Sequence, residues 1–201
     1  MIRSIIFDLG NVLLNFKPET FLLRYTKDEQ YIQNFISKVI RNKIWFNLDR
    51  GTISLENAKE EFIRKYPEDN SFIITFFEHW MEMLTPIQEN VKVLCDLKAN
   101  GYNTYILSNF IEETFEIIEK KYKFFSLFDG KIISGQEKVI KPEIEIYQKL
   151  IDKYNLVPEE CVFIDDIRSF LSRARKLNMK TILFTPNTDL RTELKKLDIS
   201  V

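Results

Sequence analysis

The chain has 201 residues, 45% of them hydrophobic, and its 29 Lys and Arg residues nearly balance its 30 Asp and Glu residues. This apolar content excludes a wholly disordered chain and suffices for a buried core. The net charge of −1 gives no global field for nucleic acid, and no local basic patch stands out. No apolar stretch approaches the roughly 20 residues that span a bilayer. We therefore expect a cytoplasmic protein without nucleic-acid or membrane partners.

Short apolar runs rich in β-branched and aromatic residues predict buried strands at residues 4–7, 103–107, 131–133, 161–164 and 181–184. Helical patterns lie between them, at residues 87–100, 112–121, 142–154, 170–177 and after residue 187. Alternating strands and helices indicate an α/β fold with a parallel sheet covered on both faces. In such open sheets, ligands bind beyond the carboxyl ends of the strands.

The segment from residue 15 to residue 85 interrupts this alternation, because its hydrophobic pattern is helical throughout. It contains both tryptophans, Trp45 and Trp80, and many of the phenylalanines. We interpret most of these aromatics as the core of a helical subdomain and a few as facing a cleft. The predicted organisation is an α/β core of residues 1–14 and 86–201 with a helical insertion at 15–85.

The cysteines and the one histidine give no sign of a metal or disulfide site. Cys95 and Cys161 lie in apolar runs without a CxxC spacing, so we expect both in the core of a protein in a reducing compartment. His79 has no second His or Cys near it, which favours a structural or surface role.

Polar residues follow three of the predicted strands directly. Asp8 follows the first strand, Ser108 and Asn109 follow the second, and Asp165 and Asp166 follow the fourth. Because carboxyl ends of parallel strands meet at one edge of a sheet, we expect these residues to converge. Two of them also have an ordinary structural explanation: Asp8 could cap a turn and Ser108 a helix.

A lysine completes this set. Lys141 stands before Pro142, the expected first residue of a helix, where a cation opposes the helix dipole unless an anion binds there. Lys141 could equally be a solvated surface residue. Several carboxylates packed together, however, are unfavourable without a counterion, and Mg²⁺ prefers carboxylate and carbonyl oxygens.

The ordered motifs FDLGNVLL, ILSN, KPEIEIY and the Asp165-Asp166 pair, with a helical insertion after the first, resemble the haloacid dehalogenase-like (HAD) hydrolase superfamily. Together with the segment WFNLDRGTIS, they are most similar to the bacterial sugar-phosphatase branch, which includes α-D-glucose-1-phosphate phosphatases. The resemblance covers essentially the whole chain. It implies a Rossmann-like core with an inserted helical cap that closes over the site.

The resemblance also implies roles for the strand-end residues. Asp8 would be the nucleophile that forms an aspartyl-phosphate, and Lys141 would orient it and neutralise charge on the phosphoryl group. Ser108 and the amide of Asn109 would bind the phosphoryl oxygens. The expected Mg²⁺ ligands are Asp8, the carbonyl of Gly10, Asp165 and Asp166.

Two positions depart from the family pattern. Relatives commonly have an aspartate, which serves as general acid and base, where this chain has Gly10, and an asparagine where it has Phe170. Such proton transfer typically contributes about 10²- to 10⁴-fold in rate. Its loss matters least for an acidic leaving alcohol, such as the anomeric hydroxyl of a sugar 1-phosphate.

The predicted function is therefore a Mg²⁺-dependent phosphatase acting on a small phosphorylated metabolite, such as glucose 1-phosphate. Two alternatives remain open: a protein that binds a phosphorylated ligand with little turnover, and a metal-independent 2-haloacid dehalogenase. The chain is expected to be a monomer or a homodimer.

Overall fold

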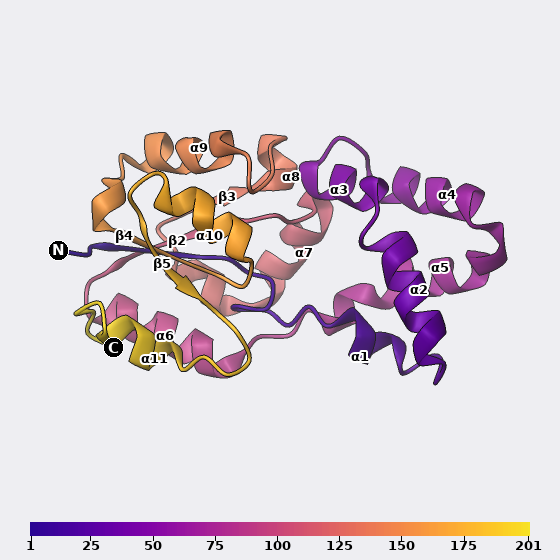
Figure 1. Cartoon of the computed structure of the whole chain (residues 1–201), viewed down its shortest axis with the longest axis horizontal. Helices are drawn as coiled ribbons and strands as arrows, with labels where there is room; N and C mark the ends of the chain where they lie inside the picture. The colour runs from indigo at the N-terminus through magenta and orange to yellow at the C-terminus, as the bar shows by residue number, and fades with distance from the viewer.

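Five parallel strands form the sheet of this protein, in the order β3-β2-β1-β4-β5, in a computed structural model that describes residues 1–201 (Figure 1). Their bounds are β1 Ser4–Phe7, β2 Asn103–Ser108, β3 Gly130–Ile133, β4 Cys161–Asp165 and β5 Lys180–Leu183. The predicted α/β class and parallel sheet are thus confirmed.

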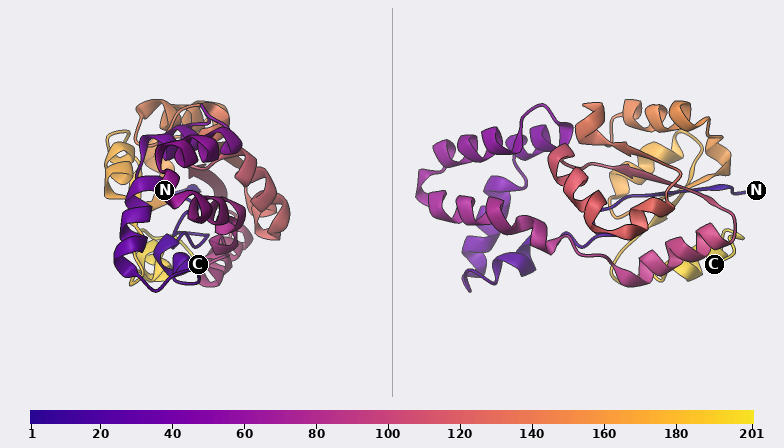
Figure 2. Two further views of the ribbon diagram at one scale, coloured as in Figure 1. Left: turned by 90° about the vertical axis from the view of Figure 1, so that its right-hand side faces the viewer. Right: turned by 180° about the vertical axis from the view of Figure 1, so that it is seen from behind.

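Helices cover both faces of this sheet, as its largely apolar strands require. Along β1, Ile5 and Phe7 point to one hydrophobic cluster and Ile6 to the other. The first face packs against α6 (Gln88–Ala99), α7 (Glu112–Lys121) and α11 (Leu190–Lys195). The second packs against α9 (Ile144–Tyr154) and α10 (Arg168–Arg175), on the opposite side in Figures 1 and 2.

The helices of the insertion lie beyond the carboxyl ends of the strands, to one side of the sheet (Figures 1 and 2). They are α1 Pro18–Leu22, α2 Glu29–Val39, α3 Lys43–Arg50, α4 Leu55–Lys65 and α5 Asn70–His79, with the 3-10 helices η1 Pro67–Asp69 and η2 Trp80–Met83. The side chains of Asp28, Asn42 and Ser54 cap α2, α3 and α4 by accepting hydrogen bonds from first-turn amides.

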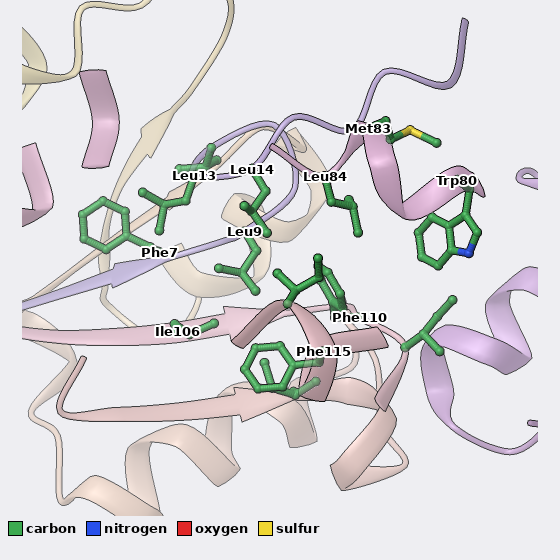
Figure 3. Packing of buried hydrophobic residues seen from close by; sticks show 14 of the residues in the cluster. Phe7, Leu9, Leu13, Leu14, Trp80, Met83, Leu84, Ile106, Phe110 and Phe115 are labelled. Carbon is green, nitrogen blue, oxygen red and sulfur yellow. The ribbon is translucent and has the colours of Figure 1, made fainter. Parts of the chain in front are cut away.

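Aromatic rings fill the interior of this helical segment. Phe35, Phe76 and Trp45 are buried, and the ring centroids of Phe35 and Phe76 lie 5.5 Å apart. The cluster that holds them is continuous with one face of the sheet and comprises 40 buried residues. Figure 3 shows the central part of this cluster, where Leu14 and Leu84 lie between the strand ends and Trp80. The division into a core (1–14 and 86–201) and a cap (15–85) remains our proposal.

Two local expectations were wrong, and one short helix was not predicted. Pro142 lies in a turn, and α9 begins two residues later, at Ile144. A short helix, α8 (Ser134–Glu137), follows β3 and has too few residues to give a periodic signal. Cys95 is exposed, because it lies on the solvent side of α6, whereas Cys161 is buried as expected.

The remaining short elements are the 3-10 helices η3 Lys123–Leu127 and η4 Pro158–Glu160. No helix combines the length and the hydropathy that crossing a membrane demands. His79 lies exposed at the end of α5, where its Nδ1 lies 2.9 Å from Glu82 Oε1.

Candidate active site

Strand register brings the predicted polar residues to one edge of the sheet. Phe7 of β1 pairs with Ile106 of β2 and with Ile164 of β4. The residues that follow, among them Asp8 and Asp165, therefore project from neighbouring strands at the same level. Both side chains are buried.

Asp8 lies at the centre of this edge, and one oxygen of its side chain makes all the polar contacts of the carboxylate. Its Oδ1 accepts hydrogen bonds from the amide of Leu9 at 2.7 Å and from the hydroxyl of Ser108 at 2.7 Å, and it lies 3.0 Å from Lys141 Nζ. Its Oδ2 accepts none. One oxygen is thus fixed by three donors, while the other remains free to act as a ligand or a nucleophile.

Lys141 is fully buried and points into this cluster, although no helix begins at Pro142, the residue after it. Its Nζ donates to Asp165 Oδ2 at 2.6 Å and lies 3.0 Å from Asp8 Oδ1. Burial, the largest single effect, lowers the pKa of Lys141, but Asp165 and Asp8 together raise it above its ordinary value. The lysine is therefore held as an ammonium ion between two carboxylates.

Aromatic rings and an asparagine hold this lysine in place. Nζ lies 4.9 Å from the ring centroid of Phe170 and 5.3 Å from that of Phe163, within cation–π range. The side chain of Asn109 accepts a hydrogen bond from the Lys141 amide at 2.7 Å and donates one to its carbonyl at 3.1 Å. Phe170, the second departure from the family pattern, thus lies against the buried ammonium group.

Asp8, Asp165 and Asp166 each offer a carboxylate oxygen, and these oxygens lie within 4.8 Å of one another. Burial raises the pKa of Asp165 to about 7, opposed by Lys141 and assisted by Asp8. Burial and Asp8 also raise the pKa of Asp166. Three carboxylates against one ammonium leave an excess of negative charge that a divalent cation would balance.

The free oxygens show which groups could hold such a cation. Both oxygens of Asp165 are occupied, Oδ2 by Lys141 and Oδ1 by the amide of Ile167 at 2.7 Å. Asp166 has Oδ1 free, since only its Oδ2 accepts a hydrogen bond, from Asn11. The carbonyl oxygen of Gly10 accepts none. This oxygen-only donor set fits a hard cation such as Mg²⁺.

Sequence reasoning missed the role of Asn11 as a structural link within the site. Asn11 adopts the left-handed conformation, at φ 53°, which asparagine tolerates better than most residues. Its side chain donates to Asp166 Oδ2 at 3.0 Å and accepts from the Phe16 amide at 3.1 Å. The Gly-Asn pair after Asp8 was the only available signal, because both residues favour turns.

A largely apolar pocket of about 90 Å³ opens beside the strand ends. It is lined by Gly10, Phe16, Trp45, Asp49, Trp80, Leu84, Asn109, Phe110 and Ile111. Figure 3 shows three of these, Trp80, Leu84 and Phe110, approaching one another from η2, the segment after it, and the loop after β2. The pocket therefore lies between the helical segment and the sheet edge, and Asp49, which sequence reasoning did not single out, is part of it.

The match to known families agrees with this geometry. Residues 2–169 match the family model described as haloacid dehalogenase-like hydrolase. A sesquiterpene phosphatase of Aspergillus oryzae is 24% identical over 195 residues, which cover 97% of this chain and 96% of that protein. A glyceraldehyde 3-phosphate phosphatase of Pyrococcus furiosus is 24% identical over 203 residues, 91% of this chain and 80% of that protein.

A similar fold occurs in a HAD-family enzyme of Bacteroides thetaiotaomicron, solved in complex with magnesium and inorganic phosphate. It superposes with a TM-score of 0.75 at 22% identity, over 96% of this chain and 99% of that one. The family match spans both the sheet and the helical insertion. The chain therefore belongs to the haloacid dehalogenase-like hydrolases.

Proposed function

We propose that this hydrolase is a Mg²⁺-dependent phosphatase that cleaves a small phosphate monoester through an aspartyl-phosphate on Asp8. The observation that carries the proposal is the state of Asp8. One of its oxygens is fixed by the Leu9 amide, Ser108 and Lys141, while the other is free beside two further aspartates. A buried carboxylate held in this way is oriented for attack on phosphorus.

The metal would be held by the Gly10 carbonyl and Asp166, whose free oxygens face no competing donor, together with the carboxylate of Asp8. Asp165 would complete the site by holding Lys141. When bound, Mg²⁺ would offset the repulsion between the Asp8 carboxylate and the phosphate. Magnesium and phosphate bound together in the Bacteroides thetaiotaomicron enzyme support this assignment.

In the first step, an oxygen of Asp8 attacks phosphorus in line. The bond from phosphorus to the alcohol oxygen breaks, and its electron pair stays on that oxygen, which then takes up a proton. Lys141 and the amide of Asn109, which donates no hydrogen bond within the protein, would bind the phosphoryl oxygens. Ser108, now donating to Asp8, would assist them.

In the second step, water attacks the phosphorus of the aspartyl-phosphate and gives up a proton. The bond from phosphorus to the Asp8 oxygen breaks, which releases inorganic phosphate and regenerates the carboxylate. Lys141, held on the opposite side by Asp165 at 2.6 Å, keeps Asp8 in place throughout. In both steps these residues act by placing charge near the phosphoryl group and by orienting the reacting atoms, which is how proteins promote phosphoryl transfer.

For the substrate, our first candidate is a sugar phosphate, in particular a hexose 1-phosphate such as glucose 1-phosphate, as in the sugar-phosphatase branch. Gly10 cannot protonate the leaving oxygen, so a leaving alcohol that is acidic for an alcohol is expelled more easily unless another residue supplies the proton. A glyceraldehyde 3-phosphate phosphatase among the relatives, which by its name acts on a small sugar phosphate, supports this candidate.

A second candidate is the phosphate ester of an apolar alcohol, which the pocket lining favours. Phe16, Trp45, Trp80 and Phe110 present rings to the space beside the strand ends, and few polar groups there could pair with sugar hydroxyls. A sesquiterpene phosphatase is among the relatives that match nearly the whole chain. In either case the partner is a small phosphorylated molecule, not nucleic acid or a membrane, bound by a monomer or a homodimer.

The two remaining alternatives fit the site less well. A metal-independent dehalogenase would bring a haloacid carboxylate to a cluster that already holds Asp8, Asp165 and Asp166. A protein that only binds a phosphorylated ligand would have no need to orient the Asp8 carboxylate with three donors.

The decisive experiment measures phosphate release from glucose 1-phosphate, glucose 6-phosphate, an isoprenoid monophosphate and p-nitrophenyl phosphate, with Mg²⁺ and with EDTA. We expect Mg²⁺-dependent release that Asp8→Asn abolishes and that Asp152→Asn, an exposed aspartate on α9, leaves unchanged. A preference for glucose 1-phosphate would support the first substrate candidate and a preference for the isoprenoid ester the second. Ligand-induced thermal stabilisation without phosphate release would support the binding protein, and halide release in EDTA the dehalogenase.

A further inference from the structure

Asp49, on the last turn of α3, is an unpaired carboxylate beside the proposed reaction centre. It lines the pocket together with Gly10 and Asn109, both of which lie at strand ends. Its side chain takes part in none of the hydrogen bonds or ion pairs of the structure. Its carbonyl oxygen accepts a hydrogen bond from Ser134 of α8. The Asp49 carboxylate therefore lines the pocket, and neither of its oxygens accepts a hydrogen bond from the protein.

Three contacts fix the backbone around Asp49 to the core. Besides the Ser134 contact, Arg50 pairs with Glu143, with Nη1 2.9 Å from Oε2. Gly51, at φ 72°, packs so tightly against Gly135 that a Cβ would lie 2.1 Å from its carbonyl oxygen. The end of α3 is thus docked beside the turn that carries Lys141. These contacts hold Asp49 at the pocket.

No other titratable side chain lines this pocket. The remaining polar side-chain groups are the Asn109 amide and the indole N–H groups of Trp45 and Trp80, and that of Trp80 is buried without a partner. None of these groups releases a proton near neutral pH. Gly10, which stands where relatives commonly carry an acid, contributes no side chain at all.

We propose that Asp49, reaching in from the helical segment, is the catalytic acid and base of the reaction assigned above to Asp8. As the bond from phosphorus to the leaving oxygen breaks, the protonated Asp49 carboxyl gives its proton to that oxygen and becomes a carboxylate. In the second step, Asp49 takes a proton from the attacking water and returns to its acid form. Atoms and charges balance, with no further reactant. This inference rests on the proposed phosphatase function.

The electrostatic surroundings of Asp49 agree with this geometry. Burial raises the pKa of Asp49 to about 7, with Asp8 adding to the shift and Lys141 opposing it. A group with a pKa near the working pH can both donate and accept a proton. Arg50, the nearest cation in the sequence, is directed away to Glu143 and does not pair with Asp49.

The test compares Asp49→Asn with the wild type on esters whose alcohols differ in acidity. We expect kcat/KM for esters of simple alkyl alcohols to fall by about 10²-fold or more, because their leaving oxygens need the proton. For p-nitrophenyl phosphate, whose leaving phenolate needs no proton, kcat/KM should change only a few-fold. kcat/KM is the right quantity, because it reports steps up to formation of the aspartyl-phosphate and not its hydrolysis.

Equal losses for all esters would overturn the proposal and indicate a role in binding or structure, and so would the absence of any loss. Glu60→Gln, an exposed acid on α4, is the matched control and should behave as the wild type on every ester. Thermal unfolding followed by circular dichroism verifies that each variant folds. If the wild type releases phosphate through Asp8 but Asp49→Asn shows no dependence on the leaving group, only the role of Asp49 fails. If the wild type releases none from any ester, both proposals fail together.

Discussion

The ammonium nitrogen of Lys141 lies 2.6 Å from Oδ2 of Asp165, and both side chains are fully buried. The same nitrogen lies 3.0 Å from Asp8 Oδ1, so one cation separates two carboxylates that would otherwise repel each other. This arrangement links the strand ends of β1 and β4 to the turn before α9. It has consequences for stability as well as for the proposed chemistry.

Replacing Lys141 by methionine should destabilise the protein by about 3–5 kcal/mol in EDTA, because it leaves buried carboxylates without their counterion. Urea unfolding at pH 8, where protonation cannot easily relieve the repulsion, measures this loss. Lys149→Met, which removes an exposed ion pair to Glu137, should cost no more than about 1 kcal/mol. Equal effects of the two substitutions would contradict the proposed role of the buried pair.

The aspartates of the Asp165-Asp166 pair should differ in their effect on Mg²⁺ affinity. Asp166→Asn removes a carboxylate with a free oxygen, so we expect affinity to fall by more than about 100-fold. Asp165→Asn removes a residue whose oxygens are already bonded to Lys141 and Ile167, and we expect a smaller loss, about tenfold, of the kind seen for outer ligands. Isothermal titration with MgCl₂ measures both constants. The reverse order would show that Asp165 is the direct ligand.

Asp49 should make the protein less stable as the pH rises. Its pKa is raised in the folded state from 3.8 to about 7, so between these values the folded chain binds more protons than the unfolded chain. The destabilisation that Asp49 causes is therefore smallest near pH 4 and grows as the pH rises toward 7. Melting temperatures of the wild type and Asp49→Asn, measured in EDTA between pH 4.5 and 7.5, should converge at the acid end. A constant difference across this range would contradict the raised pKa.

The two cysteines should react with a thiol reagent at very different rates. Cys95 is exposed, whereas burial raises the pKa of Cys161 to about 12 and keeps it a thiol at neutral pH. At pH 8 we expect one rapid equivalent of reaction in the native protein and a second only after unfolding. Cys95→Ser should abolish the rapid phase. A rapid phase that persists in this variant would show that Cys161 is accessible.

Local sequence patterns determined the fold class, because strand and helix formation depend on residues close together in the chain. The apolar run Ser4–Phe7 and its counterparts identified the sheet, and Asp8 and Ser108 were found because parallel strands end at one edge. The family followed from the same strand-end motifs in order. Element boundaries were less certain, as the start of α9 at Ile144 shows.

Tertiary packing decided which of these groups pair with one another. Asp165 rather than Asp166 holds Lys141, because register and the direction of the turn before α9 set these distances. Asp49 enters the pocket only because the end of α3 docks on α8, through contacts between residues far apart in the sequence. Periodicity describes a single element and carries no information about such docking. The sequence by itself thus determined the sheet edge and its acidic residues, and the tertiary structure decided which carboxylates are neutralised, which are free, and which residue of the helical segment joins them.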